Sequence, residues 1–172
     1  MNITLIGMPG SGKSTVGQLL ADLLGWSYLD VDREIIRQTG QTLAELIDRY
    51  GDDGFRRIEE EVNAGLAVDR TVIAPGGSVI YGPKAMAHLQ AIGKVVYLQV
   101  GEDALTQRLG DLHQRGVSIR QGQTFHDLLL ERTPLYERYA DLCQPSLADA
   151  LETARAIAEK LKLQGCSQTE DG

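Results

Sequence analysis

Short apolar runs alternate along the chain with longer stretches in which apolar residues recur every three or four positions. The short runs are NITLI, SYLD, RTVIA and KVVYLQV, at residues 2–6, 27–30, 70–74 and 94–100. Each is followed by a helical pattern or by a turn rich in proline and glycine. Because strands that alternate with helices form parallel sheets with crossover connections, the pattern predicts an α/β fold.

The helical stretches have recognisable beginnings. Two of them start with capping boxes, Thr42 with Glu45 and Thr124 with Asp127, in which paired side chains satisfy the first backbone N–H groups. The other expected helices lie at 13–25, 33–40, 51–66 and 102–109, with a last one from about Leu147 to Leu163. No internal repeat interrupts this order, so we expect one domain over residues 1–164 and a flexible tail at 165–172.

One segment follows neither pattern. Between Leu109 and Thr124 the sequence GDLHQRGVSIRQGQ contains three glycines and two arginines without a clean period. Such a stretch is typical of a mobile loop that carries function, and we expect a lid over about residues 110–124.

Composition narrows the class of protein. The chain has 172 residues, of which 42% are hydrophobic and 24% charged, and no apolar run approaches the roughly 20 residues that span a bilayer. Only MNITLI precedes the first glycine-rich loop, too little for a signal peptide, so we expect a cytoplasmic protein. A net charge of −7 disfavours binding to nucleic acid or to a membrane surface. The expected partner is therefore a small molecule.

The stretch GMPGSGKST at residues 7–15 matches the pattern GxxxxGK[ST], with a strand before it and a helix after it. Its backbone N–H groups would converge on phosphate oxygens, Lys13 would reach the β- and γ-phosphates, and the Ser14 hydroxyl would ligate Mg²⁺. The alternative is a glycine-rich turn that binds nothing. The candidate nucleotide-binding residues of this loop are Gly10, Ser11, Gly12, Lys13, Ser14 and Thr15.

The second strand ends in LDVD, and strand alternation would place Asp30 and Asp32 on the same side at the carboxyl end of the sheet. One carboxylate can then hold the metal shell while the other accepts a proton from an acceptor hydroxyl. The alternative is a pair of helix-capping acids, with Asp32 as the N-cap of the helix that follows.

The segment GDDGFRRIEEEVNAGL is expected to form an amphipathic helix. Glu59 lies nearest its apolar stripe, and Arg56 and Arg57 flank the stripe on opposite sides, so periodicity does not choose between the two arginines. One of them could bind a substrate carboxylate while Glu59 holds it; otherwise this is a solvated face with an Arg57–Glu61 pair. The expected stripe consists of Phe55, Ile58, Val62 and Leu66.

Two further segments carry candidate acceptor groups. In TVIAPGGS, Gly76 and Gly77 permit a tight turn whose amides face the cleft. In LLLERTPLYERYADL, Arg132 precedes a Thr-Pro pair, which predicts a corner between two helices from which this arginine projects. An ordinary surface arginine is the alternative.

Together these segments resemble the shikimate kinases, small P-loop kinases of the nucleoside-monophosphate-kinase type. The resemblance spans about residues 2–160 and consists of GMPGSGKST, LDVD, FRRIE, PGGS, an arginine-bearing lid and RTPLY, in that order. It implies a three-layer fold with a central, mainly parallel sheet of about five strands, helices on both faces and a mobile lid. It also implies ATP-dependent phosphorylation of shikimate to shikimate 3-phosphate with Mg²⁺, by a monomer.

The resemblance also implies residue roles on the acceptor side. Asp32 resembles the acid that contacts the acceptor hydroxyl, and Asp30 the acid that holds Mg²⁺ through water. Arg56, the first arginine of FRRIE, is similar to the carboxylate-binding arginine, and Glu59 to its orienting partner. The implied substrate-binding residues are Asp32, Arg56, Gly76, Gly77, Ser78 and Arg132.

On the nucleotide side, Arg108 resembles the arginine that stacks on adenine, and Arg115 the lid arginine that closes over the phosphates. Two positions depart from the family. Ser78 stands where the family has a third glycine, and Gly116 stands where proline follows the lid arginine. Arg120 is therefore an alternative lid arginine. Two alternative functions also stay open: a kinase for another hydroxy acid or sugar acid, and a non-catalytic nucleotide-binding regulatory protein.

Overall fold

The structure, a computed structural model, describes residues 1–108 and 122–166 and contains a five-stranded sheet. All its neighbouring strands are parallel, in the order β2-β3-β1-β4-β5, which confirms the expected α/β class. The fifth strand was not singled out from the sequence because its short, polar LCQP lies at the sheet edge. The strands are β1 (Asn2–Ile6), β2 (Ser27–Asp30), β3 (Thr71–Ala74), β4 (Gly93–Gln99) and β5 (Leu142–Pro145).

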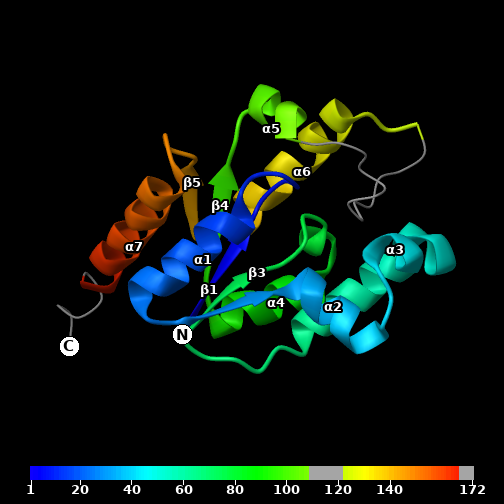
Figure 1. Cartoon of the computed structure of the whole chain (residues 1–172), viewed down its shortest axis with the longest axis horizontal. Coiled ribbons are helices and arrows are strands. Elements are labelled where there is room, and N and C mark those ends of the chain that lie inside the picture. The colour runs from blue at the N-terminus through cyan, green and yellow to red at the C-terminus, as the bar shows by residue number, and fades with distance from the viewer. Residues whose placement is uncertain (109–121, 167–172) are drawn as a thin grey trace.

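Helices cover both faces of this sheet, so the molecule has three layers (Figure 1). Helices α1 and α7 pack together on one face, and α3, α4 and α6 lie on the other. The helices are α1 (Lys13–Leu24), α2 (Val31–Thr39), α3 (Leu43–Ala64), the 3₁₀ turn η1 (Val79–Tyr81), α4 (Pro83–Ile92), α5 (Glu102–Arg108), α6 (Phe125–Tyr139) and α7 (Ala150–Cys166). Among these helices, none is both long and apolar enough to cross a lipid bilayer.

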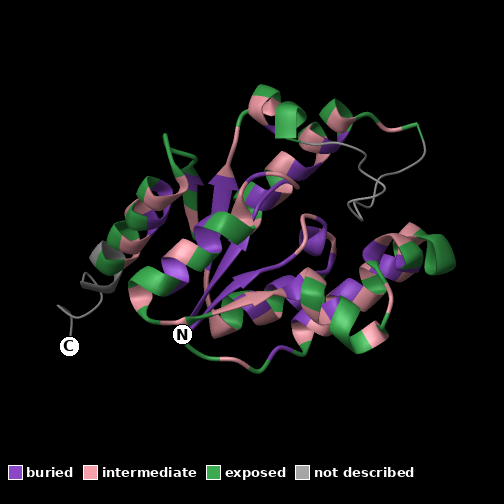
Figure 2. Ribbon diagram, viewed as in Figure 1, coloured by how far each residue is buried: buried purple, intermediate pink, exposed green. Residues whose placement is uncertain are grey.

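The three inner strands, β1, β3 and β4, are largely buried, as Figure 2 shows. Because side chains alternate along a strand, Val96 and Leu98 of β4 pack toward α1 and α7. Their neighbours Val95 and Tyr97 join the cluster beneath α3, α4 and α6. The inner strands are therefore rich in apolar residues, as expected for a parallel sheet covered on both faces.

The helix boundaries confirm some sequence predictions and correct others. Both capping boxes form, at Thr42 and at Thr124. The corner expected at the Thr-Pro pair is absent from the described chain, since α6 continues through Pro134 as one helix. Helix α7 begins at Ala150 rather than near Leu147 and extends to residue 166, beyond the expected boundary at 164.

Two expected segments fall largely outside the described residues. The lid predicted for about 110–124 lies mainly within 109–121, and most of the tail predicted for 165–172 lies within 167–172. Residues 122–124 are described, with Thr124 as the N-cap of α6.

The sheet order determines which loops meet. Strand β3 pairs with β1 on one side and β2 on the other. The segments that follow these three strands therefore emerge side by side at the carboxyl edge, where open parallel sheets bind ligands. These segments are the glycine-rich loop GMPGSGKST after β1, called the phosphate loop below, the start of α2 after β2, and the PGGS turn after β3.

Asn2 connects three segments of the chain at the amino-terminal end of the sheet. Its buried side-chain amide donates to the carbonyls of Val68 (2.9 Å) and Ile92 (3.2 Å), and its Oδ1 accepts from the N–H of Thr71 (3.0 Å).

Asn2→Ala is expected to lower the free energy of unfolding by about 2 kcal/mol or more, because it leaves buried backbone groups without partners. Urea denaturation measures this loss. The exposed control Asp22→Ala should change stability by less than about 0.5 kcal/mol, and an equal effect of both variants would contradict the assignment.

Candidate active site

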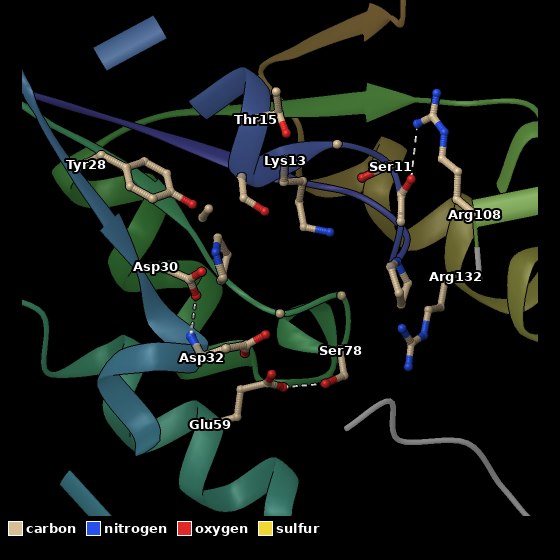
Figure 3. A pocket seen from close by; sticks show the side chains of 18 of the residues that line it. Ser11, Lys13, Thr15, Tyr28, Asp30, Asp32, Glu59, Ser78, Arg108 and Arg132 are labelled. Atoms are coloured by element: carbon tan, nitrogen blue, oxygen red, sulfur yellow. Dashed lines mark hydrogen bonds between the residues drawn. The ribbon is translucent and has the colours of Figure 1, made fainter. Parts of the chain in front are cut away.

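A cavity of about 570 Å³ opens at the carboxyl edge of the sheet (Figure 3). Segments far apart in the sequence contribute to it: the loop before α1, the β2–α2 junction, α3, the turn after β3, α5 and α6. Its lining includes residues 9–15, Tyr28, Asp30, Asp32, Phe55, Glu59, residues 74–78, Arg108 and Arg132. Most of the side chains that the sequence nominated are therefore brought together.

The phosphate loop leaves the first turn of α1 without a side-chain cap. Gly12 occupies the N-cap position with a φ of 91°, in the left-handed region that favours glycine, and no side chain caps the helix there. Helices α3 and α6, by contrast, begin with threonine caps. The exposed N–H groups of the first turn and the positive end of the helix dipole thus form a site for an anion.

Lys13 extends back along this loop. Its Nζ donates hydrogen bonds to the carbonyls of Gly7 (2.8 Å) and Met8 (3.0 Å). Desolvation of the ammonium group lowers the pKa of Lys13 to about 8, although the charge of Asp32 opposes the shift. The lysine is thus held beside the anion site in its charged form near neutral pH.

The two acids of LDVD have different positions. Asp30 is the N-cap of α2, and its Oδ1 accepts from the N–H groups of Asp32 (3.0 Å) and Arg33 (3.3 Å). The alternative with Asp32 as the N-cap is therefore wrong, and strand alternation does not relate the two acids because β2 ends at Asp30. Both nevertheless line the cavity, because the first turn of α2 faces it.

Asp32 is the acid suited to accept a proton. Burial raises its pKa to about 6, and the nearby charge of Asp30 adds to the shift while Lys13 opposes it. Its Oδ1 is buried and makes no hydrogen bond within the described part of the chain. A carboxylate of this basicity can receive a hydroxyl proton near neutral pH.

Glu59 lies at the centre of the buried side of α3, not at the edge of an apolar stripe. The buried positions are Phe55, Glu59 and Asn63, whereas Ile58 and Val62 of the predicted stripe are only partly buried. The buried side of this part of α3 is thus shifted by one position from Ile58 and Val62 of the predicted stripe, to the polar residues Glu59 and Asn63.

Ser78 holds the Glu59 carboxylate. Its hydroxyl donates to Oε1 of Glu59 at 2.6 Å, as the dashed line in Figure 3 marks. Burial raises the pKa of Glu59 to about 7, and the hydrogen bond from Ser78 opposes this rise. The side chain that replaces the family's third glycine is therefore engaged with a buried acid.

The PGGS turn fits between charged side chains that leave no room for a Cβ. A Cβ on Gly76 would lie 2.7 Å from Oε2 of Glu59 and 3.0 Å from Oδ1 of Asp32. One on Gly77 would lie 3.0 Å from Nη1 of Arg132. Tyr136 of α6 holds the turn in place, because its hydroxyl donates to the Gly77 carbonyl at 2.6 Å.

The candidate arginines differ in placement. Arg132 is 1% exposed and lines the cavity from within α6 rather than from a corner. Arg56 is not among the lining residues; its guanidinium carbon lies 4.0 Å from the ring centroid of Tyr81. The corresponding atom of Arg132 lies 5.4 Å from the same ring. Arg57 is exposed.

Sequence reasoning missed Tyr81. It lies three residues after Ser78 in an apolar VIY stretch, and only its proximity to the PGGS turn could have drawn attention to it.

Arg108 reaches the mouth of the cavity from α5, where its Nη1 donates to the Gly10 carbonyl at 3.1 Å. Arg115 and Arg120 lie outside the described residues.

The cavity contains few candidate metal ligands. Over the described residues, no group of three or more His, Cys, Asp or Glu side chains could hold a metal ion by itself. The Ser14 hydroxyl and the Asp30 carboxylate line the cavity beside the anion site. Hard oxygen donors in such small number fit Mg²⁺, which typically takes one or two protein ligands and completes its shell with phosphate and water.

Comparison with known proteins identifies close similarities over nearly the whole chain. The family model for shikimate kinase matches residues 9–162. The shikimate kinase of Thermodesulfovibrio yellowstonii is 37% identical over 163 residues, which cover 93% of this chain and 92% of that protein. The shikimate kinase of Moorella thermoacetica is 39% identical over 165 residues and 94% of both chains.

Solved structures agree with this similarity. A shikimate kinase from Acinetobacter baumannii in complex with shikimate aligns with a TM-score of 0.79 at 32% identity, over 99% of this chain and 95% of that chain. The shikimate kinase from Aquifex aeolicus aligns with a TM-score of 0.84 at 28% identity, over 96% of this chain and 98% of that chain.

The raised pKa of Glu59 predicts a pH-dependent stability. In the unfolded chain this acid titrates near its ordinary value of 4.5, whereas in the folded protein it titrates at about 7. As the pH rises between these values, the unfolded state loses its proton first, so the protein loses stability. Glu59→Gln retains the neutral form and should therefore be more stable than the wild type by up to about 3 kcal/mol at pH 8, with no difference near pH 4.

Urea denaturation at several pH values measures this difference. The conserved shape of glutamine allows Ser78 to keep its hydrogen bond, so packing should change little. A difference in stability that is independent of pH would contradict the titration of Glu59 in this range.

Proposed function

Because the chain belongs to the shikimate kinase family, we propose that this cavity is where it transfers the γ-phosphoryl group of ATP to the 3-hydroxyl of shikimate. The observation that carries the assignment of the site is the presence of three features in one cavity: an uncapped helix N-terminus with Lys13, the basic carboxylate of Asp32, and the buried arginine Arg132. They match the three requirements of the reaction, namely a phosphate site, a proton acceptor and an anchor for the acceptor's carboxylate.

In the proposed reaction the 3-hydroxyl oxygen forms a bond to the γ-phosphorus, while the bond from this phosphorus to the β–γ bridging oxygen breaks. Asp32 receives the hydroxyl proton, and ADP leaves with the bridging oxygen. Lys13 and the first-turn amides of α1 neutralise charge on the phosphates. The protein contributes mainly alignment and electrostatic stabilisation.

Ser14 and Asp30 would hold Mg²⁺ in this site. The ion supplies charge neutralisation on the phosphates when it is bound. Asp30 is already oriented by its two backbone hydrogen bonds at the start of α2, so its carboxylate is positioned beside the phosphate loop. Loss of that capping role would also destabilise α2, which couples the metal site to the fold.

On the acceptor side, Arg132 and Arg56 would bind the carboxylate, with Gly76, Gly77 and Ser78 forming the adjoining wall. A planar guanidinium binds a carboxylate through two parallel hydrogen bonds, which determines orientation as well as affinity. The proximity of Asp32 to this wall supports the proposal, because Oδ1 lies 3.0 Å from the Cβ position of Gly76. A carboxylate held near Arg132 leaves the acceptor ring facing the proposed base.

Three sequence predictions remain proposals. Arg108 would contact the nucleotide at the mouth of the cavity, and Arg115, or alternatively Arg120, would close over the phosphates. ATP as the phosphoryl donor supports a cytoplasmic location.

The direct test is ATP consumption measured with shikimate and with a panel of other hydroxy acids and sugar acids. Lys13→Ala serves as the inactive control, because it removes the phosphate-binding ammonium. Turnover with shikimate supports the proposal. Turnover only with another acceptor would support a different kinase on the same scaffold, and ATP binding without any turnover would support a regulatory protein.

Asp32→Asn is expected to reduce kcat about a hundredfold or more, because it removes the proposed proton acceptor. The Kd for ATP should change little, since the phosphate ligands are retained. Steady-state kinetics and nucleotide binding by calorimetry measure the two quantities. If ATP affinity collapses instead, Asp32 acts mainly at the metal and the roles of the two acids are reversed.

Arg132→Met is expected to lower kcat/KM for shikimate about a hundredfold or more, because a buried charged partner of the carboxylate is lost. The Kd for ATP should stay nearly constant and serves as the control for folding of the nucleotide site. With the wild type, an analogue whose carboxylate is replaced by a neutral amide should have a lower kcat/KM than shikimate. With Arg132→Met, the two acceptors should have similar kcat/KM values. Equal rates of the wild type with shikimate and with the amide would refute carboxylate recognition.

A further inference from the structure

Tyr81 lies outside the cavity lining but touches both of the arginines proposed to bind the acceptor. It is the last residue of η1, three positions after Ser78. The guanidinium carbon of Arg56 lies 4.0 Å from its ring centroid, and that of Arg132 lies 5.4 Å away. A guanidinium within about 6 Å of an aromatic ring face is attracted by the negative charge density of that face.

The ring itself is held in place through its hydroxyl group. The Tyr81 hydroxyl donates to Oε2 of Glu131 at 2.6 Å, and Gln123 donates to the same oxygen at 3.3 Å. Glu131 directly precedes Arg132 on α6. The tyrosine therefore joins the turn after β3 to the helix that carries the buried arginine.

The ring is the aromatic contact of the Arg56 guanidinium in the described part of the chain. The Nε of Arg56 is buried and makes no hydrogen bond to any described residue. Glu59, the acid one turn further along α3, instead accepts the hydrogen bond from Ser78. The close approach of the Tyr81 ring thus constrains where the Arg56 guanidinium lies.

In the free protein, two guanidinium groups that are to bind one carboxylate repel each other, because no anion yet lies between them. An aromatic ring that attracts both groups offsets this repulsion without competing for the carboxylate, because a ring carries no formal charge. Arranging the arginines before binding also lowers the ordering cost that binding would otherwise incur.

We propose that Tyr81 is a positioning residue for acceptor recognition: its ring holds the guanidinium of Arg56 beside that of Arg132, and so assembles the two-arginine site for the acceptor's carboxylate. This inference rests on the proposed function, and it adds a residue outside the cavity to the determinants of acceptor affinity. Its effect should be confined to acceptor binding, since the hydrogen bond and ring contacts of Tyr81 within the described residues involve Glu131, Arg56 and Arg132 and not the phosphate loop or Asp32.

The first experiment compares Tyr81→Leu with Tyr81→Phe. Loss of the ring in Tyr81→Leu should raise the KM for shikimate about tenfold, with kcat and the KM for ATP within about twofold of the wild type. Tyr81→Phe keeps the ring and should stay within about threefold. Tyr50→Leu is the matched control, because Tyr50 also stacks on an arginine, Arg49 at 5.2 Å, but is exposed and outside the site; it should have no effect.

Two further measurements separate ring electrostatics from packing. Replacement of Tyr81 by phenylalanine with increasing fluorination keeps the shape and weakens the ring's negative face, so the KM for shikimate should rise with each fluorine. The neutral amide analogue should show no such trend. These variants also serve if Tyr81→Leu does not fold. An unchanged KM across the fluorinated series, or an equal change with the amide, would overturn the proposal.

A readout without acceptor distinguishes this inference from the proposed function. In the NMR spectrum of the free protein, the Nε–H signal of Arg56 should show the ring-current shift of a stacked guanidinium, and Tyr81→Leu should abolish it. An unshifted signal would refute the positioning role even if shikimate is phosphorylated. If shikimate is not turned over but the shift is present, the positioning role stands and the acceptor assignment fails.

Discussion

Removing the Glu59 carboxylate from water is the constraint around which the acceptor side of the cavity is arranged. The residue is 2% exposed, on a helix face that otherwise packs into the core. Such a charge is costly to bury unless hydrogen bonds and opposite charges compensate for it. Ser78 supplies the hydrogen bond, and the positive charges of Arg132 and Arg56 lower the pKa that burial has raised. Gly76 lacks a side chain because the carboxylate occupies the space where its Cβ would lie.

The sheet turns this local arrangement into a site. The position of β3 between β2 and β1 places the PGGS turn between the phosphate loop and the start of α2. Tyr136 attaches the same turn to α6, one turn beyond Arg132, through a fully buried side chain stacked on Tyr97 of β4. The distances between phosphate site, proton acceptor and arginines are therefore determined by strand spacing and by buried contacts rather than by exposed loops.

The sequence was sufficient where the physical cause is local. The phosphate loop follows from glycines at positive φ before a helix, and the capping boxes at Thr42 and Thr124 follow from paired residues three positions apart. It was insufficient where the cause is tertiary. Glu59 and Asn63 interrupt the apolar stripe of α3 because their partners come from other segments or from the helix backbone.

Similar reasons explain the other corrections. Pro134 was expected to end a helix, but α6 continues because packing of the buried Arg132 and Tyr136 outweighs one lost backbone hydrogen bond. Asp30 rather than Asp32 caps α2 because the strand ends two residues earlier than the alternation implied. Tyr81 had no signal in its own segment, since its two arginines lie on α3 and α6.

The continuity of the phosphate loop has a consequence for how such an enzyme changes over evolutionary time. The loop is one uninterrupted stretch of nine residues, whereas the proposed acceptor wall draws residues from α3, the PGGS turn and α6. Single substitutions in those three elements can reshape the wall while the loop stays intact. Acceptor preference and phosphoryl-donor use can therefore diverge at different rates, and Ser78 of the PGGS turn is one position where a single substitution would act on the acceptor side.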